Sequence, residues 1–286
     1  MKTYNDIYFD VRKKLKEGGI ETFALEARLI IAAAADKTQE ALVRDFGLYV
    51  NDGFEEKVAQ CVERRLAGEP VAYITGEWEF YGLMLQVNSD VLIPRTDTEV
   101  LAEKAIELMR GREAGKRVLD LCCGSGCVGI AVAANVPDCR VVMVDQSLKA
   151  LAVSRANVFK NNLVRSITCV DADALSDPPM LIGRFDLVVC NPPYIPSEDI
   201  IGLDISVRDY EPVSALDGGE DGLLFYREIT KRWKAVLKEN GCLMYECGIG
   251  QAEDVKRIMA ENGFANVVSF KDTGGIDRVV AGIYPG

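Results

Sequence analysis

Residues Asn191, Pro192, Pro193 and Tyr194 form the group whose types and spacing most strongly suggest chemistry. They follow the apolar run Leu187–Cys190, which has the composition of a strand that is covered on both faces. Two consecutive prolines remove two backbone donors and fix two φ angles, so neither a strand nor a helix continues through this turn. Asn191 would then hold its side-chain amide at the carboxyl end of a strand, where open α/β sheets bind ligands.

Such a turn could bind a planar NH₂ group. An amide nitrogen is a poor nucleophile because its lone pair is delocalised into the carbonyl. The Asn191 side-chain oxygen and the Pro192 carbonyl could each accept one hydrogen of the NH₂ group, while Tyr194 packs against its plane. This arrangement exposes the lone pair without a general base, which agrees with a chain that contains no histidine. A rigid turn with a buried Tyr194 is the purely structural alternative.

A second candidate site is the glycine-rich segment that follows Asp120. Gly124, Gly126 and Gly129 satisfy the pattern G-x-G-x-x-G, and Asp145 lies near the offset of a ribose-binding acid, so a nicotinamide dinucleotide is one possible ligand. Asp120 favours a different ligand, because a carboxylate at the mouth of the loop would repel a pyrophosphate. It would attract the ammonium and sulfonium groups of S-adenosylmethionine, which we therefore prefer as the predicted cofactor.

Two further acids extend this predicted cofactor site. Asp145 ends the second strand of the predicted sheet, and its two carboxylate oxygens could accept both ribose hydroxyls. Its structural alternative is to cap the helix that begins near Ser147. Asp173 follows the third strand and could accept from an adenine amino group, with Ala174 lining the ring, although an acid in a loop is more often only solvated.

Composition limits the classes of function. The chain has 286 residues and a formal net charge of −11, which argues against sequence-independent binding to nucleic acid. Without histidine, His-based triads and His-ligated zinc are excluded. The nine cysteines fit reduced thiols better than disulfides, and the Cys122/Cys123/Cys127 cluster lacks the third correctly spaced cysteine of an iron–sulfur motif. We therefore expect no metal.

The order of the predicted elements indicates two domains and an α/β fold. Helical periodicity runs through residues 1–70, including a helix over 54–66 and a short helix capped by Thr38. Short extended runs over 71–94 predict a hairpin linker, and Thr96 with Glu99 would form a capping box for the next helix. Residues 95–286 alternate strands and helices, which predicts a mainly parallel sheet. The predicted strands cover 117–121, 140–145, 167–171, 185–190, 242–247, 265–270 and 278–284, with helices after Gly126, over 148–161 and over 223–238.

The sequence 191–194 matches the (D/N)PP(Y/F) motif of methyltransferases that modify amino nitrogens conjugated to planar systems, both adenine and glutamine. Three further segments, Gly68–Gly76, Ile93–Glu99 and Tyr210–Gly219, make nearly the whole chain resemble the peptide chain release factor glutamine methyltransferases. The resemblance implies a class I S-adenosylmethionine-dependent methyltransferase fold, a Rossmann-like sheet of seven strands with a reversed last hairpin, and a helical amino-terminal domain for docking the substrate. It also implies methylation of the glutamine in the Gly-Gly-Gln motif of release factors, with S-adenosylhomocysteine as the product.

Carried over to this chain, the resemblance assigns the target glutamine to Asn191, Pro192, Pro193 and Tyr194. It assigns the donor to the following residues, besides Asn191: Asp120, Cys122, Cys123, Gly124, Ser125, Gly126, Asp145, Asp173 and Ala174. Many relatives have an aromatic residue at the position of Ala174, and glycine followed by a small or hydroxylated residue at the positions of Cys122 and Cys123. The amino terminus has no apolar signal core, and no apolar run reaches the roughly 20 residues of a membrane span, so we expect a cytoplasmic protein and a monomer.

Three alternatives remain open from the sequence. Adenine methylation of nucleic acid shares the 191–194 motif but is disfavoured by the acidic charge and the lack of a basic patch. A nicotinamide oxidoreductase would use the glycine pattern and Asp145. A binding module without activity would hold the cofactor but would not need Asn191.

Overall fold

The computed structural model describes residues 2–113 and 115–286, and it divides the chain into two compact units. The first, called here the helical unit, contains the residues up to Glu77 together with Asp204–Tyr210. The second, the sheet unit, contains Trp78–Leu203 and Glu211–Gly286. Most of the predicted hairpin linker thus belongs to the sheet unit, and a short segment from the second half of the chain joins the helical unit.

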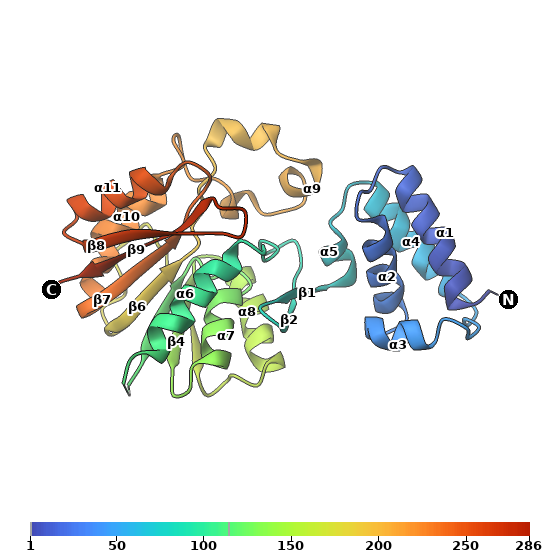
Figure 1. The fold of residues 1–286 in the computed structure, drawn as a ribbon, viewed down its shortest axis with the longest axis horizontal. Helices are drawn as coiled ribbons and strands as arrows, with labels where there is room; N and C mark the ends of the chain where they lie inside the picture. Colours follow the sequence, from blue (N-terminus) through green and yellow to red (C-terminus); the bar gives the residue numbers. More distant parts are fainter. Residues whose placement is uncertain (1, 114) are drawn as a thin grey trace. The chain divides into compact units, whose positions relative to one another are not determined.

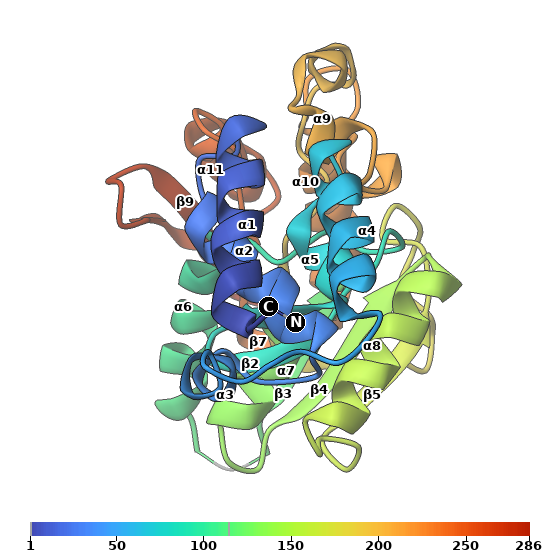
Figure 2. The same cartoon turned by 90° about the vertical axis from the view of Figure 1, so that its right-hand side faces the viewer.

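The helical unit is a bundle in which α1, α2 and α4 pack on one another (Figure 2). Its helices are α1 (Tyr4–Glu17), α2 (Phe23–Ala34), α3 (Gln39–Arg44), α4 (Phe54–Leu66), α5 (Val71–Thr75) and, from the distant segment, α9 (Ile205–Arg208). The predicted cap is confirmed, because the Thr38 side chain accepts a hydrogen bond from the Ala41 N–H. The prediction of extended structure was wrong for Val71–Thr75, which forms α5 and ends at Gly76 in the left-handed conformation.

The hairpin of β1 (Glu77–Phe80) and β2 (Leu83–Gln86) is confirmed as a two-stranded sheet. The predicted capping box is wrong. The N-cap of helix α6 is Asp97, one residue beyond the predicted Thr96, and no side chain caps the helix. Glu99 instead accepts a hydrogen bond of 2.8 Å from the backbone N–H of Tyr81. Glu99 therefore fixes the hairpin turn to α6 instead of capping the helix.

The sheet unit contains one seven-stranded sheet in the order β5-β4-β3-β6-β7-β9-β8, in which only β9 runs antiparallel to its neighbours. The strands are β3 (Arg117–Leu121), β4 (Arg140–Asp145), β5 (Ile167–Asp171), β6 (Phe185–Cys190), β7 (Leu237–Glu246), β8 (Ala265–Lys271) and β9 (Asp277–Tyr284). The main helices are α6 (Thr98–Arg110), α7 (Cys127–Asn135), α8 (Leu148–Lys160), α10 (Leu224–Trp233) and α11 (Ala252–Glu261), and the 3₁₀ turns are Ser197–Gly202, Val213–Ala215 and Lys234–Val236. The predicted reversed hairpin is confirmed, whereas the helix predicted over 223–238 ends at Trp233.

Helices cover both faces of this sheet (Figure 1). Successive residues of β3 face opposite sides, as the pleat requires: Val118 packs in the core beneath α6, α7 and α8, and Leu119 packs in the core beneath α10 and α11. Burial on both faces explains why the strands read as continuous apolar runs in the sequence.

The strand order reverses between β3 and β6, which are adjacent although β4 and β5 lie between them in the chain. Leu121 pairs with Cys190, so the turns that follow these two residues leave the sheet side by side. A crevice at such a reversal point, beyond the carboxyl ends of the strands, is where open α/β sheets bind ligands. Both candidate segments of the sequence thus meet at one place.

Candidate active site

The glycine-rich turn after β3 has a backbone that few residues other than glycine adopt. Cys122, Gly124 and Gly126 have φ angles of 55°, 52° and 81°. Gly129 is constrained differently, because a Cβ atom there would lie 2.9 Å from the Asp120 carboxylate and 2.9 Å from the Met143 sulfur. The glycine spacing in the sequence therefore reflects left-handed backbone at two positions and a close helix-to-strand approach at the third.

Asp120 lies at the base of this turn and is 2 % exposed. One of its carboxylate oxygens accepts a hydrogen bond of 2.8 Å from the Gly129 N–H, and the side chain lines the pocket. Burial raises the pKa of Asp120 to about 7, and the nearby carboxylate of Asp145 adds to this effect, whereas the Gly129 N–H opposes it. A cation bound in the pocket would stabilise the ionised form.

Asp145 ends β4 and faces the same pocket. Its two oxygens accept hydrogen bonds of 2.9 Å from the backbone N–H groups of Gly124 and Ser147. Burial raises its pKa, and these two N–H groups lower it. Asp145 does not cap α8, because Ser147 does so with its own side chain, which accepts from Ala150 N–H. The Gln146 N–H also lowers the pKa of Asp145, and a carboxylate with about four lone-pair sites still has one left for a ligand.

The structure separates the two residues that were predicted to contact an adenine. Ala174 is buried and lines the pocket together with Ala172, but Asp173 between them is not part of the lining. The Asp173 carboxylate accepts from the Leu175 N–H at 2.9 Å and from the Ser176 hydroxyl at 3.0 Å. Asp173 is therefore bonded within its own turn, and its contact with an adenine stays a prediction.

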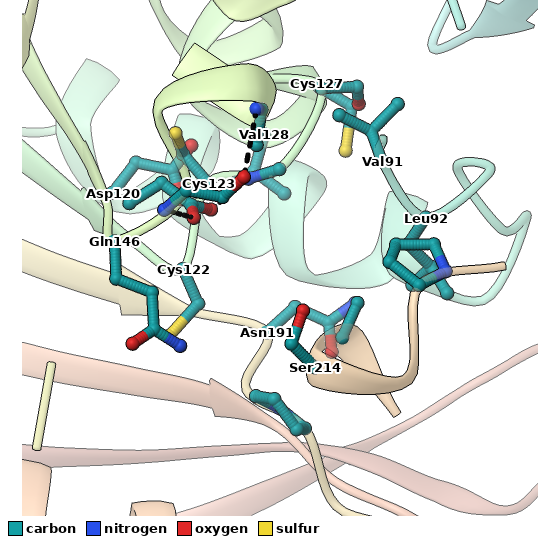
Figure 3. A pocket seen from close by; sticks show the side chains of 18 of the residues that line it. Val91, Leu92, Asp120, Cys122, Cys123, Cys127, Val128, Gln146, Asn191 and Ser214 are labelled. Atoms are coloured by element: carbon teal, nitrogen blue, oxygen red, sulfur yellow. Dashed lines mark hydrogen bonds between the residues drawn. The ribbon is translucent and has the colours of Figure 1, made fainter. Parts of the chain in front are cut away.

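The side chain of Asn191 has a defined orientation. Its amide nitrogen donates a hydrogen bond of 3.3 Å to the Thr98 hydroxyl, at the first residue of α6. Thr98 is 1 % exposed, so this partner is not exchanged for bulk water. The Asn191 oxygen is left on the other side of the amide, and Asn191 lines the pocket (Figure 3).

The rest of the 191–194 turn is buried or bonded to residues outside the pocket. Pro192 and Pro193 are buried, and Pro193 lines the pocket with Asn191. The Tyr194 hydroxyl lies 3.5 Å from the Glu246 carboxylate, and the Tyr194 carbonyl accepts 2.9 Å from the Gln251 amide. The prediction that Tyr194 packs against a substrate is not tested by these contacts, since its ring lies outside the pocket lining.

The pocket wall also includes residues that the sequence did not single out. Figure 3 shows Gln146 beside Cys122, and Ser214 beside Asn191. The lining comprises Asp90, Val91, Leu92, Pro94, Arg95, Thr98, Asp120, Cys122–Ser125, Cys127, Val128, Asp145–Ser147, Ala150, Ala172, Ala174, Asn191, Pro193, Pro212, Ser214, Ala215 and Phe225. Gly126 lies within the turn but outside this lining. Many relatives have an aromatic residue at the position of Ala174. In this chain Phe225 supplies an aromatic ring to the pocket.

The sequence contained one indication of the pocket wall that the sequence analysis did not predict. Arg95 forms an ion pair with the buried Glu211, which also accepts 3.3 Å from the Ile93 N–H. These residues come from two of the segments on which the family resemblance rests, so the pair explains why both segments matter. It joins the entry to α6 with the Pro212–Ala215 wall of the pocket.

The described residues include no group of three or more Cys, Asp or Glu side chains that could hold a metal ion, and all nine cysteines are free thiols. No helix within residues 2–113 and 115–286 has the length and apolar character needed to cross a membrane. Asp120 and Asp145 supply carboxylates, the Gly124–Gly126 backbone leaves room at the turn, and Ala150, Ala174 and Phe225 supply apolar surface. This donor set fits an organic cation with a ribose and a flat base.

The reversed-hairpin sheet, with a glycine turn after β3 and an Asn-Pro-Pro-Tyr turn after β6, defines a class I S-adenosylmethionine-dependent methyltransferase. Residues 97–202 match the family model "Methyltransferase small domain", and residues 9–76 match "PrmC N-terminal domain". The chain belongs to the release factor glutamine methyltransferase family, because curated members are similar over almost their whole length.

The relative from Geobacter sulfurreducens, named release factor glutamine methyltransferase, is 41% identical over 274 residues, which is 95% of this chain and 93% of that protein. The relative of the same name from Clostridium acetobutylicum is 36% identical over 95% of both chains. Among solved structures, a methyltransferase from Pyrococcus furiosus matches 80% of this chain and 100% of its own, with a TM-score of 0.52 and 15% identity. This last likeness concerns the fold alone.

Proposed function

We infer that this protein transfers a methyl group from S-adenosylmethionine to the side-chain amide nitrogen of the glutamine in the Gly-Gly-Gln motif of peptide chain release factors. The products are N5-methylglutamine and S-adenosylhomocysteine. Family membership supports the activity and the substrate. The observation in the site that carries the proposal is the Asn191 amide, which is oriented by Thr98 and lies beside the Asp120 turn.

The bound cofactor supplies an electrophilic methyl group on a sulfonium. Asp120 would favour the cationic part of the cofactor, and Asp145 would accept from a ribose hydroxyl with the lone pair that its backbone partners leave open. Cys122, Cys123, Gly124, Ser125 and Gly126 form the turn against which the cofactor would lie, and Ala174 would contact the base. No metal is required for these roles.

Asn191 and Pro192 would act on the glutamine. With its nitrogen bonded to Thr98, Asn191 offers its oxygen to one hydrogen of the target NH₂ group, and the Pro192 carbonyl would accept the other. Two fixed acceptors hold the NH₂ group so that the nitrogen lone pair points at the methyl donor. The proton lost after transfer goes to solvent, so a histidine base is not needed, and Tyr194 would support the amide plane.

The decisive experiment incubates the protein with methyl-labelled S-adenosylmethionine and a release factor, followed by mass measurement of the Gly-Gly-Gln peptide. A gain of one methyl group on the glutamine is expected. Replacing that glutamine in the release factor should abolish labelling, and labelling that survives the replacement would contradict the proposal.

An Asn191→Ala variant should lose about 100- to 1000-fold in kcat, the range for removal of one fixed polar group from a reacting centre. Asn135→Ala is a matched control, because Asn135 also uses its side-chain nitrogen for one internal bond, to the Ala131 carbonyl. Duplex DNA serves as the competing acceptor. Methylation of DNA but not of the release factor would favour adenine as the substrate.

A further inference from the structure

Glu246 is a buried acid that lies next to the site. The reaction described above assigns no role to it. It ends β7, and the preceding residue Tyr245 pairs with Cys190, so Glu246 lies beside the start of the 191–194 turn. Glu246 is 1 % exposed, and one of its carboxylate oxygens is buried without a hydrogen-bond partner among the described residues. A carboxylate in this condition is costly, which calls for a reason.

Glu246 faces the turn through two hydroxyl groups. The Tyr194 hydroxyl lies 3.5 Å from one carboxylate oxygen. The Thr98 hydroxyl also acts on this carboxylate, because it lowers the pKa of Glu246. Thr98 is in turn the partner of the Asn191 amide nitrogen. A chain of polar groups therefore leads from Glu246 through Thr98 to Asn191.

The number of hydrogens on each group determines which group donates and which accepts along Glu246, Thr98 and Asn191. A threonine hydroxyl has one hydrogen to donate and two lone pairs to accept with. If Thr98 donates its hydrogen to an ionised Glu246, it can only accept from Asn191, so the Asn191 nitrogen must face Thr98. The Asn191 oxygen then faces the pocket, which is the orientation that binding an NH₂ group requires.

We propose that Glu246 is a positioning residue for methyl transfer, whose ionised carboxylate orients the Thr98 hydroxyl and thereby holds the Asn191 amide with its oxygen toward the target glutamine. This inference deepens the proposed function and rests on it. Glu246 touches neither substrate nor cofactor in this scheme, and its effect passes entirely through Thr98 and, to a lesser degree, Tyr194.

The groups around Glu246 make this orientation sensitive to pH. Burial raises the pKa of Glu246 to about 7, and Asp97 at the start of α6 raises it further, while Thr98, Arg278 from β9 and Tyr194 lower it. Arg278 is itself paired with Asp97 and Asp272. A protonated Glu246 can donate to Thr98, which releases the Thr98 hydrogen toward Asn191 and favours the reversed amide. We expect kcat to fall as the pH drops below about 7.

The test compares Glu246→Gln, Thr98→Val and Thr98→Ser with the wild type. Glu246→Gln and Thr98→Val should lower kcat by about 10- to 100-fold, the loss expected when a reacting group is misplaced, with S-adenosylhomocysteine affinity within about threefold of the wild type. Thr98→Ser keeps the hydroxyl and should restore most of the activity. Thr230→Val is the matched control, because Thr230 is a buried threonine bonded to the Tyr245 hydroxyl at 2.9 Å on the other face of the sheet.

A readout independent of activity separates this inference from the proposed function. The test is made in Asp120→Asn, which removes the other buried acid of this pocket with a pKa of about 7. In this ligand-free variant the side-chain NH₂ resonances of Asn191, assigned by their loss in Asn191→Ala, should shift with pH around 7, and they should stay constant when Glu246→Gln or Thr98→Val is added. Wild-type kcat with an unchanged acid limb in Glu246→Gln, or resonances that titrate equally in Thr98→Val, would overturn the inference. Failure of the wild type to methylate release factors would instead refute the proposed function, while the resonance test still stands.

Discussion

The substitution Asp120→Asn should change how the stability of the ligand-free protein depends on pH. Asparagine has nearly the same shape and can still accept the 2.8 Å hydrogen bond from the Gly129 N–H. It cannot ionise. Because the folded-state pKa of Asp120 is raised to about 7 from an ordinary value of 3.8, the folded protein binds this proton more tightly than the unfolded chain does.

The sign and size of the effect follow from that difference in pKa. Between pH 4 and pH 7 the native state holds the proton and the unfolded state releases it, so the free energy of unfolding falls as the pH rises, and it levels off above pH 7. The full effect of Asp120 is about 4 kcal/mol at 1.36 kcal/mol per pKa unit. Between pH 5 and pH 8 it amounts to about 2.5 kcal/mol.

Denaturant unfolding followed by tryptophan fluorescence measures this effect, because both tryptophans, Trp78 and Trp233, lie in the sheet unit. The stability that the wild type loses between pH 5 and pH 8 should be smaller by about 2.5 kcal/mol in Asp120→Asn. Asp52→Asn, at an exposed turn of the helical unit, is the control and should change the free energy of unfolding by less than about 0.5 kcal/mol. An equal pH dependence in the wild type and Asp120→Asn would refute the raised pKa of the buried Asp120 carboxyl.

Three further substitutions test the site. Asp145→Asn should weaken S-adenosylhomocysteine binding by about 10- to 100-fold in calorimetry, since a charged acceptor is lost, and unchanged binding would argue against a ribose contact. Gly222→Ala should lower the melting temperature and kcat, because its Cβ would lie 2.3 Å from the Tyr194 carbonyl oxygen at a φ of 72°, and a variant with wild-type values of both would show that the turn tolerates movement. Gln251→Leu removes the donor to the same carbonyl and should cost about 1–3 kcal/mol of stability, with the loss of kcat exceeding the loss of cofactor affinity; the reverse order would contradict a role in supporting the turn.

Much of the sheet could be predicted from the sequence because its strands are buried on both faces. Each short apolar run ends at a polar residue or a glycine turn, and the predicted strands over 117–121, 140–145, 167–171 and 185–190 coincide with β3, β4, β5 and β6. The pairing of Leu121 with Cys190 then brings Asp120 and Asn191 together. At these positions the apolar pattern of the sequence and the tertiary arrangement of the strands agree.

The sequence could not reveal side chains whose partner lies on another element of the fold instead of nearby in the chain. Glu99 has the spacing of a capping-box residue, yet the Tyr81 N–H competes for it. Glu246 reads as an ordinary strand residue, and only the register between β6 and β7 places it behind Asn191. In each case the deciding partner is either distant in sequence or an unremarkable backbone group.

The segment Asp204–Tyr210 gives the chain an unusual order of assembly. Its hydrogen bond from the Tyr210 hydroxyl to the Ala67 carbonyl spans 143 residues, so about three fifths of the sheet unit must be synthesised before the helical unit can be completed. The chain also passes directly from Tyr210 in the helical unit to Glu211, which pairs with Arg95 beside the pocket.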